Sequence, residues 1–301
     1  MRVSASAKAY AKINWFLDIV GVFPDGYHRV STLLQSIDLA DELSIREKNA
    51  GEEGEDRLSF RGAPIRLNDE NLASLAARTF KKEFSIGRDI VIDIEKKIPI
   101  GAGLGGGSAD AAAVLRALRE MWGVSSDYES RFMEAAASLG ADVPFGLVGG
   151  LALAEGYGSE IRPLPDVPSQ SLLLLEPSFS ISTAWAYGEW DRLHESGLRG
   201  EPDRKNRTEN LIDALNDGDP AKIAPHLHND LEEAVMPSHP EIGEMKKALI
   251  KAGSLGSLMS GSGSVVYGIF SDKEAAERGR ALISGKKWKV HLVRTLGRSD
   301  L

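Results

Sequence analysis

One segment of the chain is decisive for its fold: Lys96-Lys97-Ile98-Pro99-Ile100-Gly101-Ala102-Gly103-Leu104-Gly105-Gly106-Gly107-Ser108-Ala109-Asp110-Ala111. Before it, isoleucines alternate with other residues over 90–95, as in a half-buried strand. After it, apolar residues recur at helical spacing to Trp122, with Ser108 expected as the N-cap and Gly123 as the stop. Glycine lets backbone amides approach a polyanion, and the N-terminus of a helix attracts negative charge. We therefore predict that this segment binds nucleotide phosphates, and we call Pro99–Ala109 the glycine loop.

Other glycine-rich motifs fit the segment less well. The spacing Gly101-x-Gly103-x-x-Gly106 matches the dinucleotide fingerprint, but one long helical pattern follows where a second strand ending in an acid is required. A Walker A loop needs Lys and then Ser or Thr directly after its last glycine, whereas Ser108-Ala109 follows here. The signature motifs of protein kinases are missing from the sequence. The remaining alternative is a tight connection without a ligand, for which so many glycines would cost entropy without benefit.

Composition narrows the class of protein. With 301 residues, 42% hydrophobic and 27% charged, the chain is expected to form two globular domains. It has no cysteine, its histidines show no metal-ligand spacing, and its apolar runs are too short to span a membrane. A strand pattern begins almost at Met1, so we expect a cytoplasmic protein without a leader peptide. The net charge of −8 argues against binding of nucleic acid.

The pattern along the chain predicts an α+β fold. Residues 3–20 alternate as a strand that places Lys12, Asn14 and Asp18 on one face, and Phe23–His28 reads as a tight turn. A proline-rich connection starting at Pro163 suggests domains over 1–162 and 163–301. Helices are expected from Asn71 through Phe84 and over 128–138, 184–193, 241–252 and 273–282. Strands are expected over 151–155, 171–175, 265–270 and 289–295. An exposed hairpin tip is expected over 47–56 and a polar loop over 195–207.

Several separated motifs carry a resemblance to a known family. They are Ala11-Lys12-Ile13-Asn14, Pro24-Asp25-Gly26-Tyr27-His28, the glycine loop, Leu139-Gly140-Ala141-Asp142-Val143-Pro144-Phe145, Asn229-Asp230-Leu231-Glu232 and Ser260-Gly261-Ser262-Gly263-Ser264. In this order and over nearly the whole chain, they resemble the GHMP kinase superfamily, and most closely its members that phosphorylate a cytidine diphosphate-linked polyol. The resemblance implies a two-domain fold: a ribosomal protein S5 domain 2-like N-terminal domain and a ferredoxin-like C-terminal domain.

The resemblance also implies roles for individual residues. Asp142 would be the general base and Lys12 its catalytic partner in phosphoryl transfer from ATP to an alcohol. The ATP phosphates would lie against Pro99, Ile100, Gly101, Ala102, Gly103, Leu104, Gly105, Gly106, Gly107, Ser108 and Ala109. Ser108 would approach Mg²⁺, and Asn71 would lie by the adenine. Independently of the resemblance, the negative net charge of the chain means that the charge of a nucleotide must be met locally, by backbone amides and by Lys12, Lys96, Lys97 or Arg29. On the substrate side, the implied residues are Asn14, Tyr27, His28 and Tyr187, with the two tyrosines sandwiching a cytosine and His28 reading its edge.

Simpler interpretations stay open at this point. From the residues alone, Asn71 reads as a helix cap and Asp142 as a turn carboxylate that caps a neighbouring amide. At the level of the whole chain, the alternatives are a homoserine or mevalonate type of GHMP kinase, or a non-catalytic nucleotide-binding relative. The Asp25–His28 turn favours a cytosine-containing substrate, because an aromatic platform serves no purpose for homoserine. Expected partners are small molecules only, with no nucleic acid and no membrane, and the oligomeric state stays open.

Overall fold

The computed structural model describes residues 4–49, 56–62, 71–194, 204–283, 285 and 287–301. These residues form two compact units, each made of several chain segments. The first unit comprises Met1–Ala11, Leu39–Pro99 and Gly105–Val148, and the second comprises Lys12–Asp38, Ile100–Leu104 and Gly149–Leu301. The long strands β1 (Ser4–Val22) and β2 (His28–Glu47) therefore contribute residues to both units, and so does the glycine loop.

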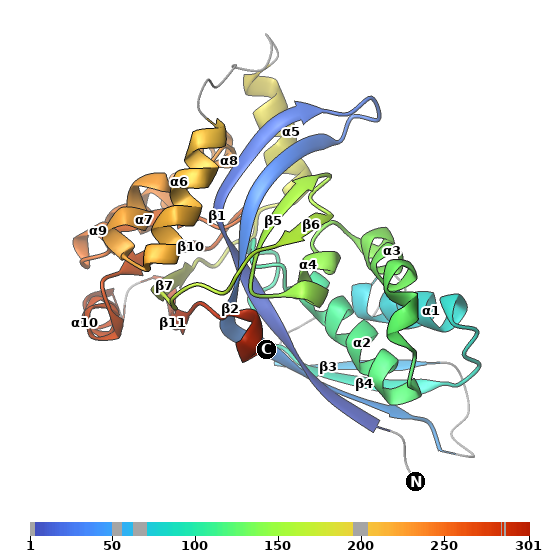
Figure 1. Ribbon diagram of the computed structural model, residues 1–301. Helices are drawn as coiled ribbons and strands as arrows, with labels where there is room; N and C mark the ends of the chain where they lie inside the picture. Colours follow the sequence, from blue (N-terminus) through green and yellow to red (C-terminus); the bar gives the residue numbers. More distant parts are fainter. Residues whose placement is uncertain (1–3, 50–55, 63–70, 195–203, 284, 286) are drawn as a thin grey trace. The chain divides into compact units, whose positions relative to one another are not determined.

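The first unit is a sheet covered by helices. Its elements are β3 (Arg57–Arg61), α1 (Leu72–Glu83), β4 (Ile90–Glu95), α2 (Gly106–Trp122), the 3-10 turn Ser126–Tyr128, α3 (Glu129–Leu139) and α4 (Val143–Val148). Strand β4 pairs with β3 in parallel and with the C-terminal part of β2 in an antiparallel ladder. Helices α1, α2 and α3 pack on one another and lie on the same side of β3 and β4 (Figure 1). Their shared core includes Phe80, Ile92 and Leu115.

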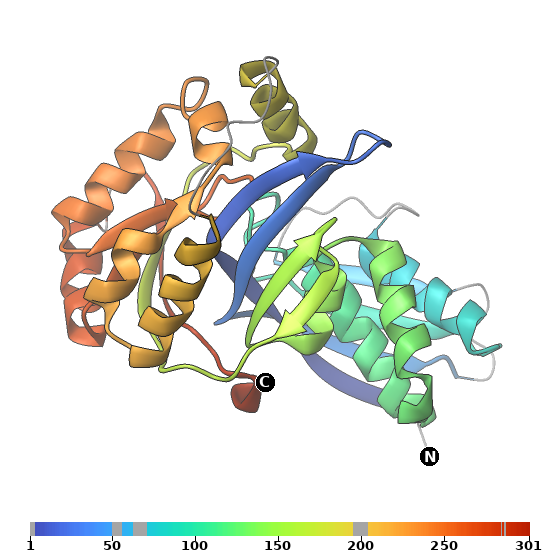
Figure 2. The same cartoon turned by 45° about the horizontal axis from the view of Figure 1, so that its top comes forward.

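The second unit contains a four-stranded antiparallel sheet with the strand order β11-β7-β10-β9. Its strands are β7 (Ser171–Glu176), β9 (Gly256–Met259), β10 (Val266–Phe270) and β11 (Lys289–Arg294), and its covering helices are α9 (Glu241–Lys251) and α10 (Lys273–Ile283). Read along the chain, these elements follow one another as β-α-β-β-α-β, the order of a ferredoxin-like fold. Leu173 and Leu175 of β7 share a core with Leu249 of α9 and Ile283 of α10. Figure 2 shows the ribbon turned so that the top of Figure 1 comes forward.

Further elements complete the second unit. They are β5 (Leu151–Gly156), β6 (Glu160–Pro163), α5 (Thr183–Leu193), α6 (Arg204–Asp217), α7 (Pro220–Ile223), the 3-10 turn Ala224–His226, β8 (His228–Asn229), α8 (Leu231–Val235) and the C-terminal 3-10 turn Arg298–Asp300. Strand β5 pairs with the N-terminal part of β2, and β8 pairs with β1 at Phe16 and Leu17. Between β1 and β2 the chain turns at Phe23–Tyr27, whose ends are joined by a hydrogen bond from the Phe23 amide to the Tyr27 carbonyl (2.7 Å).

The expected α+β class and most of the expected helices and strands are confirmed. Two local predictions are wrong. Helix α2 starts at Gly106 with Gly105 as its N-cap, so Ser108 lies within the first turn and is not the cap. Arg204–Arg207 belong to α6 and not to a polar loop, while 195–203 and the expected hairpin tip at 50–55 fall outside the described residues. The division at 162/163 stays a prediction. Among the described helices, none is both long and apolar enough to cross a membrane.

Candidate active site

The C-terminal part of the glycine loop forms the start of α2 in the first unit. Gly105 adopts the left-handed conformation (φ 69°) and no side chain caps the helix. The amide of Ala109 donates to the carbonyl of Gly105 (2.9 Å), so the preceding amides of Gly106, Gly107 and Ser108 lie before the first hydrogen bond within the helix. The described residues provide no hydrogen-bond acceptor for these three amides. Uncapped amides at the N-terminus of a 17-residue helix fit a phosphate, and the Ser108 hydroxyl is placed in the same turn.

Both ends of the glycine loop meet at a buried ion cluster in the first unit. The Lys96 ammonium, just before the loop, lies 2.5 Å from a carboxylate oxygen of Asp41 and 2.6 Å from one of Asp110 in α2. The second oxygen of Asp41 accepts from the backbone amides of Lys97 (2.5 Å) and Ile98 (2.9 Å). Lys96 was expected to offer its charge to ATP, but here its charge is balanced by two internal carboxylates. Its contact with ATP stays a prediction.

Asp110 is the unusual member of this cluster. Its side chain is buried, and its Oδ1 has no hydrogen-bond partner among the described residues. Burial, with the neighbouring Asp41 carboxylate, outweighs the attraction of Lys96 and raises the pKa of Asp110 to about 7. The carboxyl group therefore changes charge near neutral pH, at the base of the helix whose first turn carries the uncapped amides.

The N-terminal part of the glycine loop packs in the second unit, against the serine–glycine loop (Ser260–Ser264) and the strand that carries Lys12. The amide of Val265 donates to the carbonyl of Ala102 (3.2 Å), and the amide of Lys12 donates to the carbonyl of Leu104 (3.0 Å). Ser260 Oγ donates to the carbonyl of Gly103 (3.0 Å). Three motifs that are far apart in the sequence are therefore joined within one unit.

Gly103 is required by this packing. A Cβ atom added to Gly103 would lie 1.9 Å from the carbonyl oxygen of Ser260, and the residue has a positive φ of 77°. Neither the space nor the backbone conformation admits another residue without a shift of the serine–glycine loop. The approach also brings Gly261 close to Lys12, since a Cβ on Gly261 would lie 3.4 Å from the Lys12 ammonium.

Lys12 is oriented by a relay of buried polar groups in the second unit. Its ammonium donates to Asn14 Oδ1 (2.7 Å), and Asn14 Nδ2 donates to Thr32 Oγ1 (2.8 Å). The Thr32 hydroxyl in turn donates to the carbonyl of Phe16 (2.5 Å). Because that bond uses the hydroxyl proton of Thr32, the threonine can only accept from Asn14. The amide nitrogen of Asn14 therefore faces Thr32, and its amide oxygen faces the ammonium of Lys12.

Asp142 and Asn71 lie in the first unit. Asp142 directly precedes α4, and its carbonyl accepts from the amide of Gly146 (3.2 Å). Asn71 is the N-cap of α1 and accepts from the Ala73 amide (2.9 Å), which is the simpler of its two interpretations. The start of α1 nevertheless lies beside the glycine loop, because a Cβ on Gly107 would be 3.6 Å from the Leu72 side chain. The proximity of Asn71 to adenine stays a prediction.

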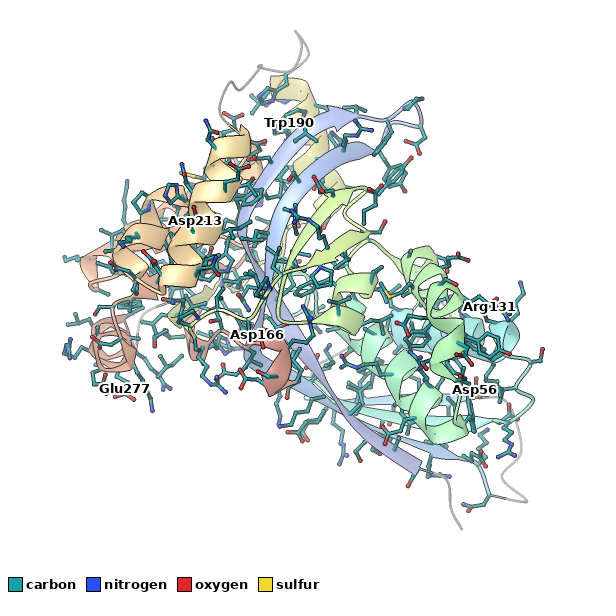
Figure 3. The ribbon with its side chains drawn as sticks, in the orientation of Figure 1. Asp56, Arg131, Asp166, Trp190, Asp213 and Glu277 are labelled. Carbon is teal, nitrogen blue, oxygen red and sulfur yellow. The ribbon has the colours of Figure 1, made fainter. Side chains whose placement is uncertain are left out.

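The expected cytosine residues lie in the second unit, in two aromatic groups. Tyr27 is 68% exposed, and its ring meets Tyr157 edge-on with 6.0 Å between the ring centroids. His28 packs against the Tyr187 ring (4.6 Å between centroids) and against the edge of Trp190, which Figure 3 labels on α5. His28 Nε2 lies 2.7 Å from Asp191 Oδ1. The sandwich of a base between Tyr27 and Tyr187 stays a prediction.

Sequence reasoning missed the residues that support these side chains. Asp41, Asp110, Thr32 and Asp191 each hold an expected site residue through a hydrogen bond or ion pair. Only Asp110 lies within an expected motif; no periodicity points to the others. A further missed cluster joins Asp18, His228 and Asp230, whose ligand atoms lie within 4.8 Å of one another. There Arg207 supplies positive charge, with its guanidinium 3.0 Å from Asp18.

Comparisons with known proteins identify the family of the chain. The model of the GHMP kinases N terminal domain matches residues 71–150, and that of the GHMP kinases C terminal matches residues 211–286. A protein of Pelotomaculum thermopropionicum named 4-diphosphocytidyl-2-C-methyl-D-erythritol kinase is 42% identical over 273 residues, which cover 91% of each chain. A protein of Gloeobacter violaceus with the same name is 40% identical over 281 residues, covering 93% of this chain and 90% of that one.

Solved structures extend the comparison. The crystal structure of a 4-(cytidine 5'-diphospho)-2C-methyl-D-erythritol kinase superposes with a TM-score of 0.78 at 32% identity, covering 97% of this chain and 100% of that one. Homoserine kinase from Cytophaga hutchinsonii shares the fold at a TM-score of 0.72 and 21% identity, with 97% and 95% covered. Fold, motifs and relatives of similar length thus agree, and the chain belongs to the GHMP kinase family.

Proposed function

We propose that this chain transfers the γ-phosphoryl group of ATP to the 2-hydroxyl of 4-diphosphocytidyl-2-C-methyl-D-erythritol, a step of the non-mevalonate isoprenoid pathway. The observation that carries the proposal is the meeting of Lys12, the glycine loop and the serine–glycine loop in the second unit. The 35–42% identity to relatives named as this kinase supports the choice of substrate. The aromatic and imidazole side chains around Tyr27 and His28 suit a pyrimidine base.

The glycine loop would hold the ATP phosphates. The uncapped amides of Gly106, Gly107 and Ser108 supply donors at a positive helix end, with no side chain on the two glycines to obstruct an anion. Ser108 would approach Mg²⁺ through its hydroxyl, and this ion would neutralise charge on the transferring phosphoryl group when bound. The negative net charge of the chain makes such local donors necessary.

Lys12 and Asp142 would carry the chemistry. Phosphoryl transfer passes through a loose transition state, so that positioning and charge neutralisation matter more than a strong base. Asp142 would accept the proton of the attacking hydroxyl as the new P–O bond forms. Lys12, held in place by Asn14, would keep the carboxylate of Asp142 ionised and stabilise negative charge on the phosphoryl oxygens.

The test is a panel of alcohols. ADP release is measured with 4-diphosphocytidyl-2-C-methyl-D-erythritol, mevalonate, homoserine and galactose, each with a control that lacks the alcohol. The proposal requires turnover of the cytidylated polyol well above that of the other three. Turnover of mevalonate or homoserine without turnover of the cytidylated polyol would overturn the choice of substrate. ADP release with none of the four would favour a non-catalytic nucleotide-binding relative.

A further inference from the structure

His28 is held by three residues of helix α5. Tyr187 packs against one face of its ring, Trp190 lies edge-on to it at 5.7 Å between centroids, and Asp191 Oδ1 lies 2.7 Å from Nε2. The side chain of His28 is 11% exposed, whereas that of Asp191 is 52% exposed. The described residues offer the ring no hydrogen bond besides the one to Asp191. Nδ1 is therefore left for a ligand.

The contact with Asp191 decides which nitrogen of the neutral imidazole carries the proton. An ionised carboxylate can only accept hydrogen bonds, so the nitrogen beside it must carry the hydrogen. In the neutral ring, the other nitrogen then has a lone pair and no hydrogen. Asp191 thereby makes Nε2 the donor and turns Nδ1 of His28 into a hydrogen-bond acceptor.

An acceptor at this position distinguishes the two common pyrimidines. Cytosine carries an amino group at C4, which donates, whereas uracil carries a carbonyl oxygen at the same position, which only accepts. The Nδ1 lone pair of His28 can accept from the cytosine amine but faces the lone pairs of a uracil oxygen. A ring free to shift its proton to Nδ1 would lose this distinction, because it could then donate to the uracil oxygen.

We propose that Asp191 is a positioning residue that fixes the tautomer of His28 and thereby makes the substrate site select cytosine over uracil. The inference rests on the proposed function, since it needs a cytidylated substrate whose base lies at His28. Asp191 itself does not touch the substrate in this account. It acts only through the ring of His28.

The first test compares two substrates. At pH 8, where an ordinary imidazole is neutral, kcat/KM is measured for the cytidine diphosphate-linked polyol and for its uridine analogue, using the full chain. In Asp191→Ala and Asp191→Asn, the ratio of the two values is expected to fall by about tenfold, within the usual worth of one base-edge contact. Asparagine serves as the closest isostere, because its amide can accept or donate and therefore permits both tautomers.

Glu189→Ala provides a matched control. Glu189 lies on the same helix and pairs with Arg192, and among the described residues no hydrogen bond or ion pair joins it to His28, so its removal should leave the ratio unchanged. A ratio that stays at the wild-type value in both Asp191 variants would overturn the proposal, even if both rates fall together. If the wild-type chain turns over neither nucleotide-linked polyol, the proposed function itself fails, which is a separate result.

The second test observes the tautomer directly. ¹⁵N NMR of the imidazole should show His28 of the free wild-type protein protonated at Nε2, with Nδ1 unprotonated. The same signals should shift toward a mixture of tautomers in Asp191→Ala. A wild-type ring that is protonated at Nδ1 would contradict the inference without reference to any assay of activity.

Discussion

At the scale of single residues, the buried polar relay shows how uncharged groups help to orient the ammonium of Lys12. The Thr32 hydroxyl donates to the carbonyl of Phe16 and accepts from the amide nitrogen of Asn14. The amide oxygen of Asn14 then accepts from the ammonium of Lys12. Lys12, Asn14 and Thr32 are all buried. An amide flip of Asn14 would set donor against donor at the ammonium, which is costly where no water can compensate.

The relay makes Thr32 testable as a positioning residue. Thr32→Val keeps the shape but removes the acceptor that fixes Asn14, so kcat should fall roughly tenfold, the equivalent of one buried hydrogen bond. The KM for ATP should change little, and Thr32→Ser should restore kcat because it keeps the hydroxyl. Steady-state kinetics on both variants provide the measurement. Ser31→Ala, at the next position of β2 and on the opposite face, is the control. Wild-type kcat in Thr32→Val would disprove the positioning role.

Asp142→Asn tests the proposed base. The amide keeps the size of the side chain but cannot accept the substrate proton, so kcat should fall by about 10²–10⁴-fold, the usual contribution of a general base. Both KM values should stay nearly constant, because the interaction is made mainly in the transition state. Lys12→Met should lower kcat as well, and the double variant should lose less than the sum of the two.

A purely structural Asp142 would behave differently. Loss of its turn would lower the melting temperature and leave kcat within about tenfold of wild type, outside the range for a lost general base. The effects of the Asp142 and Lys12 variants would then be independent and additive in free energy. Kinetics and thermal melts on the two single variants and the double variant separate these outcomes.

At the scale of elements, the base of helix α2 combines stability with pH sensitivity. Asp41, Lys96 and Asp110 join β2, the segment just before the glycine loop, and α2. The unfolded chain releases the proton of Asp110 near pH 4, whereas the folded chain keeps it until about pH 7. Between these values the native state binds more protons than the unfolded state. Its stability therefore falls as the pH rises through this window.

The expected pH effect is measurable by denaturation. From pH 5 to pH 8, the Asp110 carboxyl should lower the free energy of unfolding by on the order of 2 kcal/mol. Asp110→Asn, which cannot ionise, should remove this part of the pH dependence and be the more stable protein at pH 8. Urea melts at several pH values would show it. Glu120→Gln, an exposed carboxylate on the same helix, should leave the slope unchanged. An unchanged slope in Asp110→Asn would refute the raised pKa.

Local sequence patterns predict most of the secondary-structure elements around the site but not all of their ends or their tertiary partners. The glycine loop, its flanking strand and helix, and the stop at Gly123 follow from local patterns and are found in the structure. The wrong N-cap arose because Gly105, in a left-handed conformation, starts the helix earlier than a hydroxyl cap would. The sequence predicts a loop at the start of α6, because that part is polar and shows no apolar stripe. Partners such as Thr32 and Asp191 depend on tertiary proximity, which periodicity does not encode.

At the scale of the whole molecule, the chain passes repeatedly between its two units. Residues 100–104 of the glycine loop belong to the second unit and residues 105–109 to the first. The units consist of interleaved chain segments, whereas the proline-rich connection at Pro163 offers a single candidate boundary, which stays a prediction. The strand order β11-β7-β10-β9 is likewise set by packing between distant segments and not by any local signal. Only the family resemblance could supply it.

The divided loop leads to a prediction for hydrogen exchange. If ATP binds the whole loop, a non-hydrolysable analogue should slow amide exchange both at Ala102–Leu104 and at Gly106–Ser108, which belong to different units. Exchange measured by mass spectrometry, with and without the analogue, tests this. Helix α10 should show no change and serves as the internal reference. Protection confined to one of the two loop segments would mean that the other does not bind phosphate.

The close approach of Gly103 to Ser260 also limits which substitutions the chain can accept during evolution. One nucleotide separates a glycine codon from an alanine codon, yet at position 103 this smallest step places a methyl group 1.9 Å from a backbone oxygen 157 positions away. The two loops would therefore have to change together, through a combination that single steps cannot reach. In a library randomised at 103 and 260–263 and selected for growth, glycine at 103 should persist while other positions vary. The serine–glycine loop thus restricts which amino acids the glycine loop can tolerate at position 103.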